Sequence, residues 1–196
     1  MKLEFPGIVG SGELYLKVMK AICGDTQDKS MVDLMCHHAP YTPLLGFKDR
    51  LYLDIQNRGL DHKEEQQYFK EVDVLEYLSN SYCPYFDVSI CSDGLEHLEE
   101  SHGVFLLKKM YLYSSKQVLF TPFGDLLISQ DDHPDSHRSG WTPEKLEYVF
   151  PGSDHFAYIV FPDFHESMNA GAFFFWHCKG IEQDFERVKN ELNELG

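Results

Sequence analysis

The chain has 196 residues, enough for one domain with a large apolar core but with little room for a second. It carries 32 acidic and 17 basic side chains, and its formal net charge of -15 repels phosphate backbones at long range. This charge argues against a protein that binds bulk DNA or RNA. No stretch approaches the roughly 20 apolar residues of a membrane span, and the N-terminus lacks the apolar core of an export signal.

The cysteines are expected to be reduced. The chain has five of them, an odd number, and no two form a CxxC pair. Three lie inside apolar runs, where small buried thiols are common. We therefore expect a cytoplasmic protein that does not associate with membranes.

A helix is predicted near the start of the chain, within residues 1–28. Ser11 can cap its N-terminus, apolar residues then recur every four positions, and Gly24 supplies a stop. The glycine-rich segment 7–12 precedes this helix. No strand is predicted before that segment, so we do not interpret it as a phosphate-binding loop.

Seven apolar runs of strand length follow the helix. The first five alternate in part with helical segments, which is typical of a parallel sheet. The last two are joined by a segment too short for a crossover helix and should pair antiparallel. Thr142 can cap a helix that begins at Pro143, and an amphipathic helix from Ile181 closes the chain. The runs are 31–36, 51–55, 69–74, 86–91, 117–120, 156–161 and 172–178.

These elements predict a single α/β domain over residues 1–196. Its sheet would be doubly wound and Rossmann-like, with seven strands that are mostly parallel and an antiparallel C-terminal strand. Helices would cover both faces. No internal repeat or low-complexity segment divides the chain.

Four of the predicted strands end on an acid: Asp33, Asp54, Asp73 and Asp93. The carboxyl ends of parallel strands meet at one edge of a sheet, so these side chains should face one crevice. Each could simply cap a turn, but together they favour a nucleotide-like ligand. Asp54 lies about 20 residues after the first strand, where dinucleotide-binding folds place the acid that binds the ribose hydroxyls.

The segments DLMCHHAP, LYLDI, YFKEVDVLEYL and FDVSICSDGLEHL, in this order, resemble those of a class I S-adenosylmethionine-dependent methyltransferase. The likeness extends over nearly the whole chain. The segment HRSGWT is similar to one found after the fifth strand in some bacterial and phage methyltransferase-like proteins. The resemblance implies S-adenosylmethionine as cofactor, with contacts from the matching positions: Asp33, Asp54, Asp73, Val74, Ser92 and Asp93, and Met35, His37 and Ala39 in the first turn.

The first turn departs from the family pattern. Where the family has three alternating glycines, this chain has Met35, His37 and Ala39. Glycine suits such a turn because it adopts left-handed backbone angles freely and leaves room for the ligand. An ordinary residue pays roughly 1–2 kcal/mol for that conformation, and its side chain occupies cofactor space.

Glu96 and His97 begin the helix after the fourth predicted strand and are the candidate catalytic residues. The unperturbed imidazole of histidine has a pKa near neutrality, so a residue such as His97 could take a proton from an oxygen or nitrogen nucleophile. Glu96 could instead interact with the helix dipole. Methyl transfer needs mainly alignment, so no base is obligatory.

His133, His137 and Arg138 lie in a loop expected at the crevice and are candidate contacts to the acceptor. The neighbouring acids and histidines match no standard ligand spacing, so we expect no metal site. Trp141 precedes the Thr142 cap and is expected to pack.

Two functions follow from these residues. The first is methyl transfer from S-adenosylmethionine to an oxygen or nitrogen of a small or modified acceptor. The second is a non-catalytic, methyltransferase-like binding or assembly domain that has lost the cofactor, as the missing glycines suggest.

Overall fold

The computed structural model describes residues 1–80, 82–124, 136–150, 155–165 and 170–193. Within these ranges, three short 3-10 segments accompany the helices and strands: η1 (Thr42–Leu45), η2 (Lys63–Tyr68) and η3 (Leu95–His97). The strands are β1 (Lys2–Glu4), β2 (Ser30–Leu34), β3 (Asp49–Asp54), β4 (Phe69–Glu71), β5 (Phe86–Ser92), β6 (Ser114–Pro122), β7 (Phe156–His165) and β8 (Ala170–Cys178). The helices are α1 (Gly12–Cys23), α2 (Val74–Ser79), α3 (Glu100–Tyr113), α4 (Pro143–Val149) and α5 (Ile181–Leu192).

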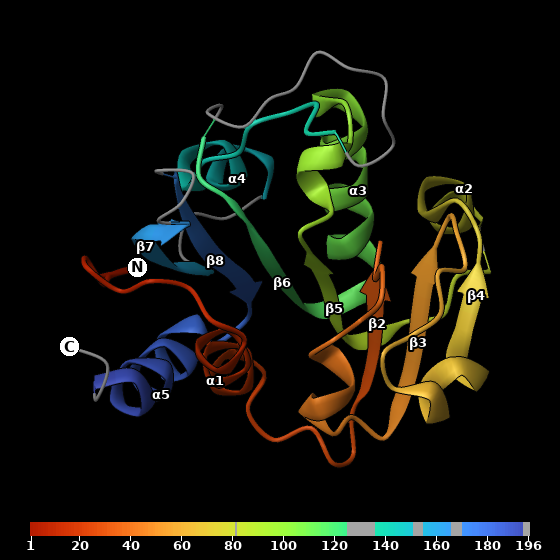
Figure 1. Ribbon diagram of the computed structural model, residues 1–196, viewed down its shortest axis with the longest axis horizontal. Coiled ribbons are helices and arrows are strands. Elements are labelled where there is room, and N and C mark those ends of the chain that lie inside the picture. The colour runs from red at the N-terminus through yellow and green to blue at the C-terminus, as the bar shows by residue number, and fades with distance from the viewer. Residues whose placement is uncertain (81, 125–135, 151–154, 166–169, 194–196) are drawn as a thin grey trace.

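The described strands form one sheet in the order β1-β7-β8-β6-β5-β2-β3-β4. Only β8 runs against its neighbours, β6 and β7, while every other described pair is parallel. The predicted mixed, mostly parallel sheet is therefore confirmed. Figure 1 shows β2 to β5 on one side of the molecule and the β7–β8 pair on the other.

The predicted number of seven strands was wrong, because β1 adds an eighth. This strand has three residues with a charged residue at each end, so it produces no apolar run. Its partner is distant in sequence, since Lys2 pairs with Tyr158. A strand therefore does precede the glycine-rich segment 7–12.

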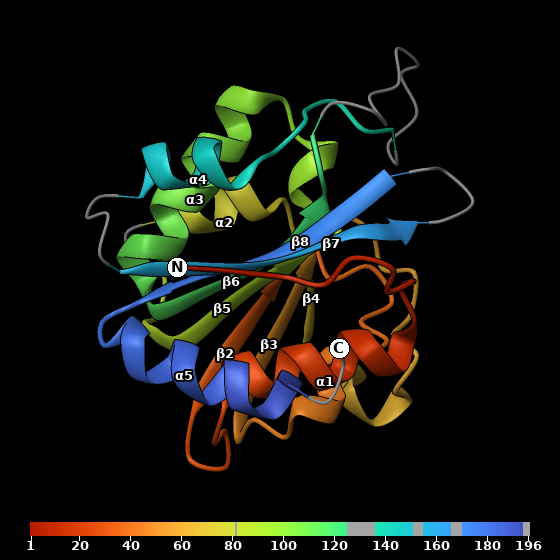
Figure 2. The same cartoon turned by 90° about the vertical axis from the view of Figure 1, so that its left-hand side faces the viewer.

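Helices cover both faces of the sheet, as predicted. Figure 2 shows α1 and α5 on one face and α2, α3 and α4 on the other. The core is correspondingly divided into two clusters. Strand β8 serves both, because Phe174 and Trp176 point into the α1–α5 layer while Phe173 and Phe175 point into the other.

The predicted helix starts are confirmed by their caps. The Ser11 Oγ accepts a hydrogen bond from the Leu14 amide, 3.1 Å away, and Gly24 ends α1 with a φ of 67°. The Thr142 Oγ1 accepts in the same way from the Lys145 amide. No described helix has the length and apolar character that crossing a membrane requires.

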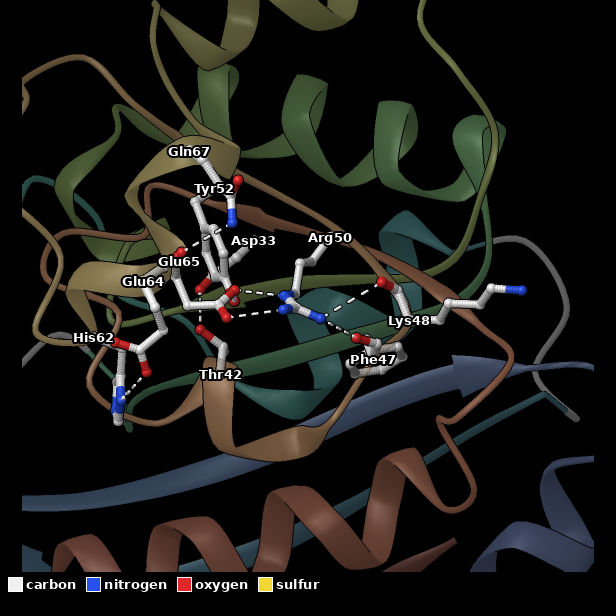
Figure 3. Close-up of polar contacts among 10 residues, drawn as sticks. All are labelled: Asp33, Thr42, Phe47, Lys48, Arg50, Tyr52, His62, Glu64, Glu65 and Gln67. Carbon is white, nitrogen blue, oxygen red and sulfur yellow. Dashed lines mark hydrogen bonds and ion pairs between the residues drawn. The ribbon is translucent and has the colours of Figure 1, made fainter.

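A partly buried ion pair connects η2 to the first half of β3 (Figure 3). Arg50 contacts both carboxylate oxygens of Glu65, and the Tyr52 hydroxyl donates to the same carboxylate over 3.2 Å. Arg50 also donates to the Phe47 carbonyl at 2.7 Å. Glu65 is nearly inaccessible, so this network satisfies a carboxylate that would otherwise be buried alone.

Candidate active site

A cleft of about 370 Å³ lies where β2 and β5 end. These adjacent strands mark the point where the connections change direction, since β3 and β4 lie on one side of β2 while β5 and β6 lie on the other. Open α/β sheets bind ligands at such a point. The lining includes Tyr15, Asp33, His37, Ser92, Asp93 and His97.

The turn after β2 keeps a left-handed backbone at the three positions that lack glycine. Met35, His37 and Ala39 have φ values of 60°, 49° and 44°. The loop thus adopts the left-handed conformation for which glycine is usually needed, although this conformation costs each of the three residues roughly 1–2 kcal/mol. His37 and Ala39 line the cleft. Met35 instead faces Gly94, where an added Cβ would come within 2.9 Å of the Met35 Cβ.

Asp33 places a buried carboxylate in the cleft. Its Oδ2 accepts a hydrogen bond from the Thr42 hydroxyl over 2.5 Å, as Figure 3 shows. Its Oδ1 is buried and has no hydrogen-bond partner among the described residues. Burial raises the pKa of this carboxyl to about 7. Because Oδ2 accepts from Thr42, Oδ1 carries the proton when the carboxyl is neutral, and it is available to accept from a ligand donor when the carboxyl is ionised.

Asp54 stabilises the turn after β2 through hydrogen bonds and is not among the residues that line the cleft. Its Oδ2 accepts from the His37 amide at 2.9 Å and its Oδ1 from the Gln56 amide at 3.1 Å. Two carboxylate oxygens offer about four lone-pair sites, so acceptor capacity remains for a ribose hydroxyl. Arg58 approaches this turn as well, with its Nη1 2.6 Å from the His37 Nε2.

Asp73 and Val74 lie away from the cleft lining. The Asp73 carboxylate caps α2 and accepts from the Leu75 and Glu76 amides at 2.7 and 3.2 Å. Val74 is buried in the core. The structure therefore gives both residues a structural role, and their contact with adenine stays a prediction.

Ser92 and Asp93 lie at the end of β5, on the floor of the cleft. The Tyr15 hydroxyl donates to the Ser92 Oγ over 2.6 Å, so α1 contributes to the site. Asp93 has a left-handed φ of 47°, and burial raises its pKa to about 7. Sequence reasoning missed Tyr15 because its spacing within α1 matches that of core residues.

Glu96, His97 and His137 come together beside the cleft. One potential ligand atom from each lies within 4.8 Å of the others, and the two imidazole rings are 5.1 Å apart. The Glu96 Oε2 accepts from the Thr121 hydroxyl at 3.1 Å. Burial, and next the nearby Asp93 charge, raise the pKa of Glu96 to about 8.

Two of the three groups in this cluster, Glu96 and His137, have pKa values shifted toward the neutral form. Burial, then His97 and His165, lower the pKa of His137, which favours a neutral imidazole. Two imidazoles and one carboxylate are also a donor set that suits a divalent transition metal. That this site binds no metal stays a prediction. His133 and its neighbours 131 and 132 lie outside the described residues.

The segment 136–142 is attached to η3. The amide of Arg138 donates to the Glu96 carbonyl at 2.7 Å, while its guanidinium lies 3.8 Å from the Glu99 carboxylate. Trp141 is buried and its indole donates to the Ser139 hydroxyl, which confirms the predicted packing role. His165, at the end of β7, was missed by sequence reasoning. Its Nε2 is buried and has no partner among the described residues.

Solved structures show that this is the fold of class I S-adenosylmethionine-dependent methyltransferases. A SAM-dependent methyltransferase from Archaeoglobus fulgidus has a TM-score of 0.64 at 18% identity, over 87% of this chain and 95% of that one. The N-methyltransferase NodS from Bradyrhizobium japonicum WM9 has a TM-score of 0.61 at 11% identity, over 85% and 94%.

The small RNA methyltransferase HEN1 has a TM-score of 0.61 at 15% identity, over 85% of this chain but only 25% of the HEN1 chain. These identities establish the fold alone. No family model matches this chain, and no curated protein sequence does. The expected class I methyltransferase fold is confirmed, whereas the likeness of HRSGWT stays a prediction.

Proposed function

We propose that this chain transfers a methyl group from S-adenosylmethionine to an oxygen or nitrogen of a small or modified acceptor. The turn after β2 carries the proposal, because Met35, His37 and Ala39 all keep left-handed backbone angles there. Strain of this kind persists where the surrounding structure imposes it and is concentrated at functional sites. A turn with no ligand to bind could relax and avoid the cost.

The residues at the cleft fit the cofactor, which when bound supplies an electrophilic methyl group. Its ammonium group needs an acceptor, and the partnerless Oδ1 of Asp33 is one. Asp54 has lone pairs left for a ribose hydroxyl after its two backbone hydrogen bonds. Ser92 and Asp93 would contact the same ligand from β5.

The acceptor would enter beside Glu96, His97 and His137. A neutral imidazole there can take the proton that an attacking oxygen or nitrogen releases. Glu96, with its raised pKa, holds a proton at neutral pH and can donate a hydrogen bond. If the same three residues bind a divalent cation, it would polarise the acceptor oxygen instead.

Three further expectations belong to this proposal. His133 and Arg138 would contact the acceptor. The charge of -15 favours a small or modified acceptor over bulk nucleic acid. We expect this activity in the cytoplasm, without a membrane.

Binding of S-adenosylhomocysteine, measured by isothermal titration calorimetry, tests the proposal. We expect one molecule per chain. Asp33→Asn should weaken binding about tenfold or more, because a hydrogen bond between charged groups contributes ~1.5–3 kcal/mol. Asp28→Asn is the control and should leave binding unchanged, since Asp28 is exposed and lies outside the cleft lining.

His37 favours a second candidate function, because its side chain lines the cleft where the family has glycine. In that case the chain would be a binding or assembly domain without cofactor. Wild-type protein that binds neither S-adenosylhomocysteine nor S-adenosylmethionine at millimolar concentration would contradict the enzyme and support this candidate.

A further inference from the structure

We propose a second ligand site, which binds an aromatic monophosphate of nucleotide size at the opposite edge of the sheet. The site is a hollow of about 660 Å³, within the range of small-molecule pockets. It lies where β5 and β6 begin and β8 ends, whereas the cleft lies where β2 and β5 end. We call it the basal pocket. This proposal is independent of methyl transfer.

The basal pocket gathers cations in a strongly acidic chain. Lys29, Lys116 and Lys179 line it, against two carboxylates. Of these, Asp184 is already bound by Lys116 and by Arg187.

The second carboxylate, Asp87, is engaged as well, because it accepts from the Ser30 amide and hydroxyl, each at 2.8 Å. Neither Lys29 nor Lys179 is ion-paired with a described residue. These two ammonium groups are therefore available to an anion, and Lys is a common partner of phosphate.

His177 contributes an unsatisfied acceptor to the same wall. Its Nδ1 lies 2.7 Å from the Gln117 Oε1. The Gln117 amide nitrogen donates to the Ser114 carbonyl at 2.8 Å, so Oε1 faces the ring and Nδ1 carries the hydrogen. The Nε2 is then an acceptor, and it is buried with no partner among the described residues. A ligand hydroxyl or amino group would supply the missing donor.

The rim of the basal pocket is aromatic and apolar. Tyr85, Tyr111 and Leu112 line it and are 63%, 40% and 60% exposed. The Tyr111 ring lies 5.4 Å from the His177 ring, so the aromatic rim adjoins the buried acceptor. Exposed rings of this kind offer a stacking surface to a planar ligand. A nucleoside monophosphate combines the three features required: an anionic head, a planar body, and hydroxyl or amino donors.

Adenosine monophosphate is the probe, followed by backbone amide shifts in nuclear magnetic resonance spectra. We expect shifts at residues 114–117 and 177–179, with adenosine and inorganic phosphate each binding more weakly. The double variant Lys29→Glu, Lys179→Glu should weaken binding about tenfold or more, because two charge-assisted contacts become repulsive.

The control Lys20→Glu, Lys63→Glu makes the same change in charge outside the pocket and should alter affinity by less than about twofold. Shifts confined to residues 33–39 and 92–97 would overturn the proposal, as would equal affinity in the two double variants or no shifts at millimolar probe. Each of these results is independent of S-adenosylhomocysteine binding in the cleft. Failure of the basal pocket is thus distinguishable from failure of the methyltransferase.

Discussion

Asp33 illustrates how burial changes the chemistry of one residue. Its pKa is raised to about 7, first by burial and to a lesser degree by the Asp54 charge. An unfolded aspartate titrates near 3.9, so between about pH 4 and 7 the folded chain binds a proton that the unfolded chain has released. The stability contributed by this group is therefore complete below about pH 4 and is lost as the pH rises through 7.

Asp33→Asn should remove this pH dependence, because asparagine cannot ionise and can still accept from Thr42. Without ligand, the free energy of unfolding of the variant should rise relative to wild type by roughly 2–3 kcal/mol between about pH 5 and 8. Urea denaturation across this range measures the difference. A difference that does not change with pH would contradict the assigned burial of the Asp33 carboxyl.

Residue types alone did not predict the conformation of the turn after β2. Tertiary contacts accompany the left-handed angles at Met35, His37 and Ala39, among them the hydrogen bond from the His37 amide to Asp54. For Asp73, in contrast, the residue type and its position at a strand end allowed two predictions, a ligand contact and a helix cap. The structure shows the cap.

At the scale of elements, α3 packs closely against the segment around Trp141 because Gly103 has no side chain at the contact. A Cβ built on Gly103 would lie 2.4 Å from the Trp141 Cζ2 and 3.3 Å from the Leu95 Cδ1. The indole is buried and held by the Ser139 hydroxyl, so it cannot move aside easily. For an alanine at this position, the gain in helix propensity and the cost of packing its methyl group against Trp141 therefore oppose each other.

Gly103→Ala should therefore lower the free energy of unfolding by about 1–2 kcal/mol, although alanine is the better helix former by about 1 kcal/mol. Thermal or urea denaturation measures the change. Ser101→Ala, on the exposed part of α3, is the control and should be neutral or slightly stabilising. Stabilisation by Gly103→Ala would show that Trp141 does not pack as described.

Residues at the helix starts predicted those helices correctly, because a helix cap depends only on nearby residues. Ser11, Thr142 and Pro143 marked helix starts through cap chemistry that acts within one turn. Strand β1 was missed because it forms only by pairing with β7, far along the chain. The histidine cluster was predicted as separate residues, whereas its assembly depends on backbone hydrogen bonds between Arg138, Ser139 and the Glu96 carbonyl.

At the scale of the whole molecule, the sheet separates two sites of different charge. The carboxyl edge gathers buried acids, which suit a cofactor that carries positive charge. The amino edge gathers the lysines of the basal pocket. The mixed sheet was predictable from strand spacing, but the basal pocket was not, because its residues come from five distant segments.

We propose above all that the cleft holds S-adenosylmethionine despite the missing glycines. A crystal structure of the chain with S-adenosylhomocysteine tests it most directly. We expect the ligand ammonium on the Asp33 Oδ1, the ribose hydroxyls on Asp54, and left-handed angles retained at Met35, His37 and Ala39. A crystal soaked with millimolar ligand whose cleft contains none, or a ligand bound elsewhere, would contradict the account.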